Sequence, residues 1–354
     1  MKKSKEYFRG CLLGGAIGDA FGWPVEFLLD KEIKMKYGDT GVTDLILGKN
    51  GKAEITDDTQ MTLFTGEGLL VASEGGISSD VISYVYDGYL AWLYTQGEYD
   101  KNKDLLNSSL LSKKELFAKR APGNTCIESL KSGRIGTIQN PINNSKGCGG
   151  VMRVAPVGLM FQSRKAFQIA CECAAITHGH PSGYISAGIF ACIIAEIMLG
   201  KTLEQCINTA LDIAKEYKGH EECITLIKKA LYFASNDFDS KSAINQIGEG
   251  WVGEETLAIA LYVCLKYKDE FDRAIITAVN HDGDSDSTGS ITGNILGAYC
   301  GTQKIPKKWI EKLELLEVIT NLADDFYRHD FSLKSQRYLI KRRFCKKDYY
   351  ELLL

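Results

Sequence analysis

Residues 183–199 place the strongest limit on how this chain can fold. A helix over this stretch would be apolar on nearly every side, with Glu196 as its only charged residue. The run is shorter than a membrane span needs, and that charge interrupts it. A helix that is apolar all round must be covered by neighbours on every side. We therefore expect it in the middle of a bundle rather than on its rim.

The rest of the chain alternates apolar segments of helical length with short polar or glycine-containing breaks. Its 354 residues include six prolines, and strand patterns are scarce. No repeat of solenoid length and no flexible linker divides the sequence. We predict an all-α fold with one domain over residues 1–330 and a basic and apolar extension over 331–354, packed on or trailing from that domain. The candidate helices span residues 7–21, 57–73, 80–94, 153–161, 165–177, 183–199, 203–217, 221–234, 254–267, 269–279, 286–299 and 309–327.

The charge balance and the cysteines argue against several classes of protein. The 42 Lys and Arg residues nearly balance the 45 Asp and Glu residues, for a net charge of -3, so we expect neither nucleic acid nor a membrane surface as a main partner. Eleven cysteines occur without a CxxC pair, which favours reduced thiols. Asp19 and nearby glycines interrupt the apolar run that a signal peptide needs. We expect a cytoplasmic monomer.

The stretch "NHDGDSDSTGS" carries three aspartates at alternate positions, Asp282, Asp284 and Asp286. It is not an EF-hand loop, because Ser287 occupies the position that requires glycine and Gly293 the position that requires glutamate. Capping of the following helix accounts for about one carboxylate. Three carboxylates this close repel one another unless a cation gathers them. A cation site is therefore favoured over a plain helix cap.

A second acidic cluster lies far upstream, where Thr56, Asp57, Asp58 and Thr59 precede an amphipathic helix. Both clusters place a hydroxyl and two carboxylates at the start of a helix. If two such starts face each other, they supply four carboxylates and two hydroxyls. Oxygen ligands of this kind suit hard cations such as Mg²⁺ or Mn²⁺, and the number of carboxylates suits two of them. Two separate helix caps are the alternative.

Glycines gather before two further helices. Gly147, Gly149 and Gly150 lie in "NNSKGCGGVMRVAP", and "RAPGNTCIESL" has a similar form at residues 122–125. Backbone N–H groups at such helix starts bind phosphate well, although plain turns have the same composition. His178, just before the apolar helix, is either a core residue or a hydrogen-bond partner of a ribose or diphosphate.

The N-terminal stretch "GCLLGGAIGDAFGWPVEF" contributes two further carboxylates, Asp19 and Glu26. Glu26 directly follows the apolar "WPV", so it is a better candidate for a carboxylate that faces a site than for a surface charge. Gly14, Gly15 and Gly18 permit close packing of a helix.

The chain contains, in this order, "GGAIGDAFGWPVEF", "TDDTQMTL", "APGNT", "GCGGVMRVAPVGL", "THGHPSGY", "GWVGEETLAIALY" and "GDSDSTGSITGNILGA". Together these motifs resemble the ADP-ribosylglycohydrolases, the family of dinitrogenase reductase-activating glycohydrolase and ADP-ribosylarginine hydrolase. The resemblance spans roughly residues 9–302, which is most of the chain. The resemblance implies an all-helical fold with two Mg²⁺ or Mn²⁺ ions in a cleft. It also implies hydrolysis of the bond between C1″ of the distal ribose of ADP-ribose and a modified side chain.

Carried across by position, the resemblance implies three groups of site residues. The metal ligands would be Thr56, Asp57, Asp58, Asp284, Asp286 and Ser287. The substrate would contact Gly123, Asn124, Gly147, Cys148, Gly149, Gly150 and His178. Glu26 would lie over the distal ribose, and Asp57, Asp58 and Glu26 would assist proton transfer as an oxocarbenium-like transition state forms.

Within the family, "THGHPSGY" and the serine at position 287 look closer to members that act on arginine-linked ADP-ribose on protein. The alternatives are serine, nucleic-acid or O-acetyl linkages, or an ADP-ribose-binding protein without activity. A binuclear phosphohydrolase is disfavoured because such sites usually recruit histidine, and only His281 lies near the two acidic clusters. One departure from the family is Asp282, where glycine is more common.

Overall fold

The regular structure is helical throughout the part of the chain that the computed structural model describes, residues 4–74, 80–99, 108–236 and 238–330. The strand-like pairings in this part are three isolated bridges, so the all-α prediction is confirmed. The α-helices are α1 (Lys5–Gly22), α2 (Asp30–Tyr37), α3 (Asp57–Glu74), α4 (Val81–Thr95), α5 (Asn124–Lys131), α6 (Ala155–Met160), α7 (Ser163–Ala175), α8 (Pro181–Met198), α9 (Leu203–Ala214), α10 (Glu221–Ala234), α11 (Ser240–Ile247), α12 (Gly253–Lys266), α13 (Phe271–Val279), α14 (Ser285–Cys300), α15 (Lys307–Lys312) and α16 (Leu316–Asp330). Short 3₁₀ helices are η1 (Trp23–Val25), η2 (Ser109–Ser112), η3 (Lys114–Phe117), η4 (Cys148–Gly150) and η5 (Thr302–Lys304). The expected extension over 331–354 lies outside the described residues.

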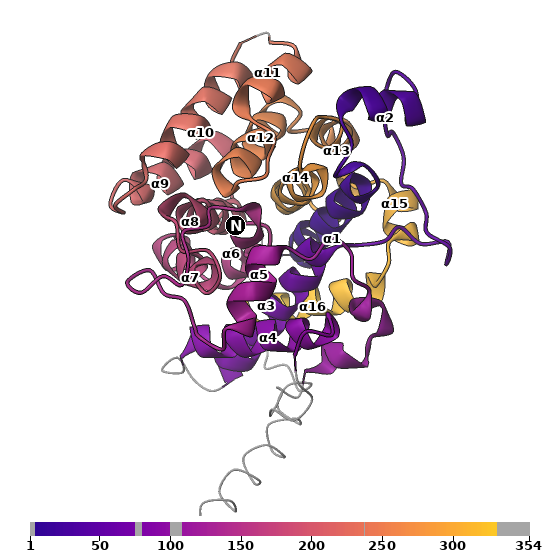
Figure 1. Ribbon diagram of the computed structural model, residues 1–354. Coiled ribbons are helices and arrows are strands. Elements are labelled where there is room, and N and C mark those ends of the chain that lie inside the picture. Colours follow the sequence, from indigo (N-terminus) through magenta and orange to yellow (C-terminus); the bar gives the residue numbers. More distant parts are fainter. Residues whose placement is uncertain (1–3, 75–79, 100–107, 237, 331–354) are drawn as a thin grey trace, which may run out of the picture.

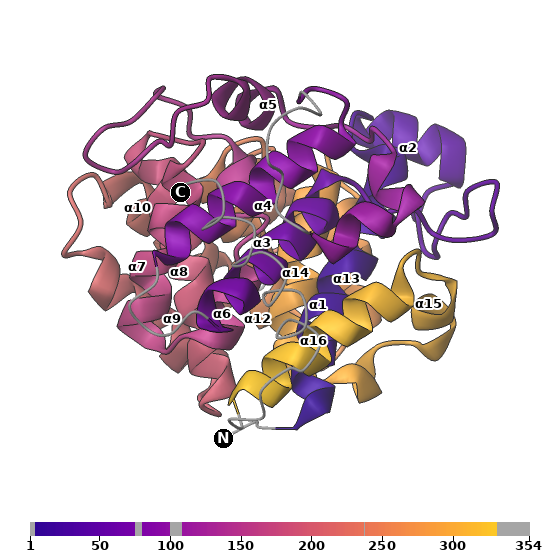
Figure 2. The same ribbon diagram turned by 90° about the horizontal axis from the view of Figure 1, so that it is seen from below.

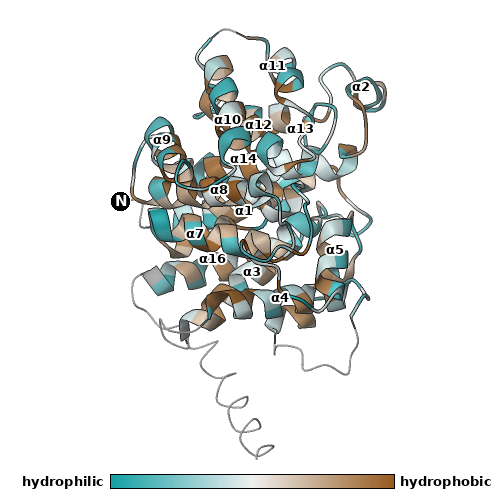
Figure 3. Ribbon diagram, turned by 60° about the vertical axis from the view of Figure 1, so that its left-hand side comes forward, coloured by the Kyte–Doolittle hydropathy of each residue, from teal (hydrophilic) through white to brown (hydrophobic). Residues whose placement is uncertain are grey.

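Helix α8 lies in the interior, as its sequence predicts. Every residue from Ser182 to Met198 is buried, and α6, α7, α9 and α12 pack against it. By length and composition α8 could cross a membrane, but 89% of it is buried inside the protein. Its ribbon is mainly brown in Figure 3, whereas α9 and α11 show much more teal. The apolar surface of α8 is therefore covered by neighbouring helices of the same chain.

Helices α1 and α14 cross the middle of the molecule side by side and run in opposite directions (Figure 1). Glycines occupy every fourth position along the contact. They pair as Gly10 with Gly297, Gly14 with Gly293, and Gly18 with Gly289. A Cβ added to Gly18, Gly293 or Gly297 would lie 1.9 Å from a carbonyl oxygen of the other helix. The two backbones therefore touch, and no larger residue fits between them.

This contact places the end of α1 against the start of α14. A Cβ on Gly22 would lie 2.3 Å from the backbone nitrogen of Asp286. Helix α3 packs against both α1 and α14, so three helix ends converge. Figure 2 shows α1, α3 and α14 together in the middle of the molecule, with α7 to α10 on one side and α15 on the other. The acidic helix starts of α3 and α14 are brought together by this arrangement.

The helix expected over 309–327 is interrupted, and tertiary contacts explain the break. The backbone of Ala53 accepts a hydrogen bond from Glu314 N–H (3.0 Å) and donates one to the carbonyl of Lys312 (2.8 Å). Leu315 then adopts a left-handed φ of 54°. The backbone groups that would continue α15 are used by a segment from the other end of the chain. Two helices, α15 and α16, result.

Three short helices were not among those expected. Helix α2 lies between the predicted helices 7–21 and 57–73, α5 begins within the "APGNT" motif, and α11 precedes the loop that leads to α12. Each has eight residues. A segment this short shows about two turns of periodicity, too little to separate it from a polar loop.

The glycine contact predicts a strong and local sensitivity to substitution. Gly293→Ala would place Cβ 1.9 Å from the Gly14 carbonyl oxygen, so the two backbones must separate. We expect the free energy of unfolding to fall by about 3 kcal/mol, the upper part of the usual range for overpacking, as measured by urea denaturation. Gly66→Ala in α3 is the matched control, because its Cβ meets the ends of side chains, the nearest being Leu322 at 2.8 Å. Equal losses in the two variants would contradict the backbone-contact explanation.

Candidate active site

The start of α3 is held by Asp19 of α1. The buried Asp19 carboxylate accepts hydrogen bonds from the backbone N–H of Thr56 (3.0 Å) and of Thr59 (3.1 Å). It also accepts from both threonine hydroxyls, that of Thr56 at 2.9 Å. A carboxylate at a helix N-terminus satisfies N–H groups that have no partner within the helix. Asp19 therefore fixes the first acidic cluster against α1, a role that the sequence analysis did not assign.

The start of α14 is organised around Ser287. Asp284 Oδ1 accepts the Ser287 N–H at 3.2 Å, and Asp286 Oδ1 accepts the same group at 2.9 Å. The Ser287 hydroxyl donates to Asp58 Oδ2 at 3.3 Å. The two acidic helix starts, one from each end of the chain, therefore face each other across this hydrogen bond.

At these two helix starts, buried carboxylates lie close enough for their negative charges to repel one another. Burial, followed by repulsion from Asp286, raises the pKa of Asp57 and Asp58 well above the ordinary value. The same two causes raise the pKa of Glu26 to about 11 and that of Asp19 to about 7. A cluster of buried acids with raised pKa values either holds protons or binds a cation.

Three carboxylate oxygens in this group are buried without a hydrogen-bond partner: Asp58 Oδ1, Asp284 Oδ2 and Glu26 Oε2. An orphaned buried oxygen is unfavourable and often marks the place of an ion, water or substrate. As they lie, no three Asp, Glu, His or Cys side chains in the described part of the chain are arranged to hold a metal ion. The oxygen donors are present, and an ion would have to draw them together.

The glycine loop 147–150 packs over His178. A Cβ on Gly149 would lie 3.0 Å from Cε1 of His178, and one on Gly147 would lie 3.4 Å from Nε2. Burial, followed by the nearby positive charge of Arg153, lowers the pKa of His178 to about 3, so the ring is neutral. Contact with His178 is thus one reason why this loop needs glycine.

Arg153 orders the region around His178. Its buried guanidinium donates to Thr177 Oγ1 (2.6 Å) and to Cys126 Sγ (3.3 Å), and lies 4.3 Å from the centroid of the Tyr89 ring. Thr177 Oγ1 in turn shares a hydrogen bond with His178 Nδ1 at 2.8 Å. Arg153 therefore fixes the orientation of the histidine. No motif indicated this role for Arg153, and a single arginine within the apolar "VMRVAPVGL" was the available signal.

Both loops expected to bind substrate lie beside the acidic clusters. The Gly123 N–H donates to Asp57 Oδ2 at 3.1 Å, and Asn124 follows as the exposed first residue of α5. Burial, followed by the nearby negative charge of Asp284, raises the pKa of the Cys148 thiol in the glycine loop well above its ordinary value. Each loop thus lies beside one of the two helix starts.

Two residues beside the second cluster have structural partners. Asp282 Oδ1 accepts the Asp30 N–H at 2.6 Å, which ties the start of α2 to the loop before α14. His281 Nδ1 lies 2.7 Å from the Asp282 carbonyl oxygen, and its Nε2 lies 2.9 Å from the Thr288 hydroxyl. Because both ring nitrogens are occupied, His281 is not available as a metal ligand.

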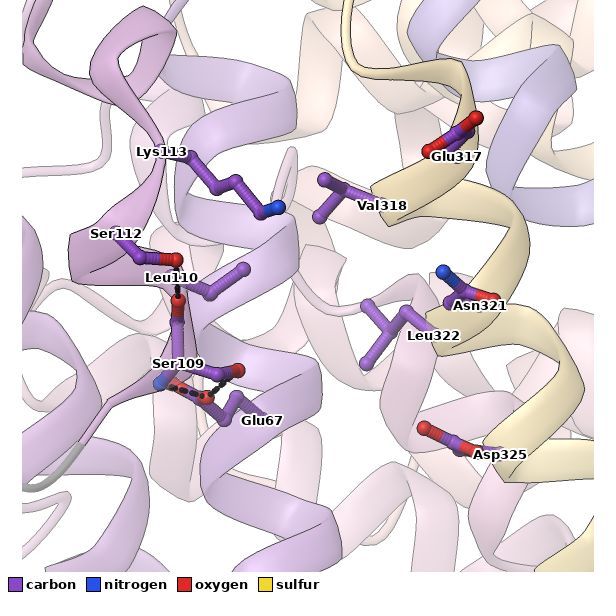
Figure 4. A pocket seen from close by; sticks show the side chains of 10 residues that line it. All are labelled: Glu67, Ser109, Leu110, Ser112, Lys113, Glu317, Val318, Asn321, Leu322 and Asp325. Atoms are coloured by element: carbon purple, nitrogen blue, oxygen red, sulfur yellow. Dashed lines mark hydrogen bonds between the residues drawn. The ribbon is translucent and has the colours of Figure 1, made fainter. Parts of the chain in front are cut away.

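A cavity of about 210 Å³ lies farther along α3, between that helix, η2 and α16 (Figure 4). Three acidic residues line it, Glu67, Glu317 and Asp325. Glu67 accepts hydrogen bonds from the backbone N–H (2.8 Å) and the hydroxyl (2.6 Å) of Ser109. Glu67 follows Asp57 by ten residues, a separation of about 15 Å along a helix. This cavity is therefore separate from the paired acidic clusters.

The chain belongs to the ADP-ribosylglycohydrolase family, whose sequence profile matches residues 1–335. It is 26% identical to the ADP-ribosylarginine hydrolase of Serratia proteamaculans over 92% of this chain and 80% of that protein. It is also 26% identical to the ADP-ribosyl-[dinitrogen reductase] glycohydrolase of Rhodospirillum rubrum over 86% of this chain and 90% of that protein. A solved ADP-ribosylglycohydrolase-related protein complex has the same fold, with a TM-score of 0.61, 24% identity and coverage of 93% and 99% of the two chains.

In a metal chelator, Asp286→Asn should make the protein more stable. Repulsion from Asp286 raises the folded-state pKa of Asp57 and Asp58, so wild-type stability should fall as pH rises above the unfolded-state values of about 4. Lowering the folded-state pKa of one carboxyl group by one unit corresponds to about 1.4 kcal/mol of stability at a pH above that pKa. We expect a gain of about 1 kcal/mol at pH 8 and a shallower fall between pH 5 and 8, from urea denaturation in EDTA. Asp272→Asn, an exposed aspartate in α13, is the control; a destabilised Asp286→Asn would contradict the repulsion.

Proposed function

We propose that this protein is a divalent-cation-dependent hydrolase that releases ADP-ribose from arginine side chains of modified proteins. The observation that carries the proposal is the meeting of two acidic helix starts around carboxylate oxygens that have no partner. The arginine linkage is supported by the relative named as an ADP-ribosylarginine hydrolase. The partners are then ADP-ribosylated protein and ADP-ribose. We propose a cytoplasmic monomer as the working form.

Six residues would hold two Mg²⁺ or Mn²⁺ ions: Thr56, Asp57, Asp58, Asp284, Asp286 and Ser287. Their oxygen atoms are the ligands that such hard cations prefer. The orphaned oxygens of Asp58 and Asp284 fit this role. When bound, the ions would orient the hydroxyls of the distal ribose and lower the pKa of a water molecule.

The side chains of the protein have separate tasks in the proposed reaction. The bond from C1″ to the arginine nitrogen breaks, a water oxygen joins C1″, and the departing guanidine takes up a proton. Glu26 Oε2 is buried, has no partner and belongs to the same acidic group, so it can exchange a proton with the reacting atoms. Asp57 and Asp58 are the other carboxylates suited to accept the proton from water.

The rest of ADP-ribose would lie along the two loops. The backbone N–H groups of Gly149 and Gly150, ahead of α6, suit a diphosphate, whereas the Cys148 N–H is donated to the Trp251 carbonyl. His178, neutral and fixed by Thr177 and Arg153, lies against this turn and can only offer or accept a hydrogen bond. Gly123 and Asn124 would contact the ligand from the start of α5.

The main test is release of free ADP-ribose from arginine-modified protein. We expect release with Mg²⁺ or Mn²⁺ but not with EDTA, and a loss of about 100-fold or more in Asp57→Ala and Asp286→Ala. The ions should also raise the melting temperature of the wild type and of the control Asp272→Ala, but not of the two site variants. This second readout reports binding without activity.

Other outcomes separate the alternatives. Release from serine, nucleic-acid or O-acetyl conjugates but not from arginine would change the linkage and keep the metal-dependent chemistry. Binding of ADP-ribose with no release from any conjugate would identify a binding protein. Release that is unaffected by EDTA and by both variants would overturn the proposed site.

Glu26→Gln tests the proton-transfer role separately from metal binding. The amide keeps the size of the side chain but cannot donate or accept a proton in the same way. We expect kcat on arginine-linked ADP-ribose to fall by about 100-fold, within the usual range for a general acid or base. The metal-induced rise in melting temperature should remain, because Glu26 is not among the proposed ligands. An unchanged kcat would remove Glu26 from the mechanism.

A further inference from the structure

Two exposed aromatic rings stack on each other beside the candidate site. Phe27 is 66% exposed and Trp251 is 38% exposed. Their ring centroids lie 5.8 Å apart with an angle of 18° between the ring planes. Phe27 directly follows the site residue Glu26, and Trp251 lies in the loop between α11 and α12. Two exposed rings in contact form a larger apolar patch than a single exposed side chain, and such patches often mark a binding surface.

Trp251 also lines an open cavity of about 630 Å³. The same cavity is lined by three carboxylates, Glu249, Glu255 and Asp282, and by the amide side chain of Asn245. None of the described residues that line it is a lysine or arginine. An aromatic face beside several carboxylates is the combination that attracts an organic cation.

The neighbouring charges leave this cavity negative. Glu255 Oε2 accepts the N–H groups of Glu249 (3.2 Å) and Gly250 (3.1 Å), and Asp282 accepts that of Asp30; none of these donors carries a charge. Lys241, on α11, pairs with Asp30 at 2.5 Å, and the charge of Asp282 also acts on it. Asp282 is therefore partly offset. Glu249 and Glu255 form no ion pair in the described part of the chain, so the cavity keeps a negative charge.

The wall of the cavity is bonded directly to the candidate site. The Trp251 carbonyl accepts the Cys148 N–H of the glycine loop at 3.2 Å, and the Glu249 carbonyl accepts the Asp284 N–H at 2.8 Å. The cavity is therefore attached both to the loop proposed to hold the diphosphate and to a proposed metal ligand. A leaving group that departs from C1″ toward Glu26 and Phe27 would enter the region that this cavity borders.

We propose that Phe27, Trp251 and the acidic cavity form the subsite for the leaving group, which receives the guanidinium of the modified arginine and positively charged residues next to it in the target protein. This inference rests on the proposed function and specifies its substrate class. A planar guanidinium can lie on an indole face while its N–H groups point to carboxylates. A serine side chain has no charge to place there. The subsite would thus contribute to the choice of arginine over other linkages.

The first test measures binding without catalysis. Nα-acetylarginine amide is titrated into the full-length protein while tryptophan fluorescence is followed, because Trp251 is an exposed indole whereas Trp92 and Trp309 are buried and Trp23 is half-buried. Nα-acetylcitrulline amide is the matched neutral ligand. We expect saturable quenching by the arginine compound, at least about threefold weaker binding of the citrulline compound, and loss of the signal in Trp251→Leu. Equal binding of the two compounds, or quenching that persists in Trp251→Leu, would overturn the proposal.

The second test uses hydrolysis of an arginine-ADP-ribosylated basic peptide. Trp251→Leu and Glu249→Gln should raise KM about threefold to tenfold with less change in kcat, because the lost contacts form in the ground state as well. The Kd for free ADP-ribose should stay constant, because ADP-ribose lacks the leaving group. Tyr232→Leu is the control, since Tyr232 is 58% exposed but does not line the cavity. A shift in the ADP-ribose Kd equal to that in KM would overturn the leaving-group assignment.

The two proposals fail in different ways. If arginine conjugates are not hydrolysed while the guanidinium compound still binds selectively through Trp251, the proposed function falls and the cation subsite stands. If arginine conjugates are hydrolysed with a metal but Trp251→Leu and Glu249→Gln leave KM unchanged, the subsite falls and the proposed function stands.

Discussion

Backbone contact between α1 and α14 is the constraint on which the rest of the structure depends. Three glycine pairs allow the two helices to touch along their length, and this closeness sets the end of α1 beside the start of α14. Asp19 then extends from α1 to the first turn of α3 and aligns Thr56 and the aspartates that follow. The position of the first acidic cluster is thus determined by glycines that carry no chemistry themselves.

The same arrangement forces like charges together. Burial raises the pKa of each aspartate in the paired clusters, and repulsion between carboxylates raises it further for Asp57, Asp58 and Asp286. Helix N-termini offset only part of this effect. Proteins commonly accept lower stability at sites where function requires an unfavourable grouping. The buried oxygens of Asp58 and Asp284 that lack a hydrogen-bond partner are another sign of this unfavourable grouping. The unfavourable grouping of carboxylates therefore coincides with the two acidic motifs of the sequence.

Local patterns were sufficient for some features and insufficient for others. The position of α8 and the acidic starts of α3 and α14 could be predicted, because apolar periodicity and capping residues are visible within a single segment. The break at Leu315 could not, because it follows from hydrogen bonds with Ala53. Asp282 departs from the family pattern, and its bond to the Asp30 N–H gives it a structural role. The sequence could not indicate that Asp30 is the partner of Asp282. The sequence suggested that His178 lies near a ligand, but it could not show that Arg153 orients His178 through Thr177.

The hydrogen bonds that hold Ile55 in place affect when the candidate site can form during protein synthesis. Arg120 Nη1 donates to the Ile55 carbonyl (2.7 Å) and to Glu314 (2.6 Å), so the residue before Thr56 depends on a residue near the end of α15. At ribosomal rates, synthesis from the first acidic cluster to the second takes on the order of 10–50 s. During that interval the first cluster lacks its opposing helix, and Glu314, which holds Arg120 against Ile55, is made later still. A nascent chain, or a fragment that stops before α14, therefore cannot carry a working site, and activity would appear only when almost the whole polypeptide has emerged and closed on itself.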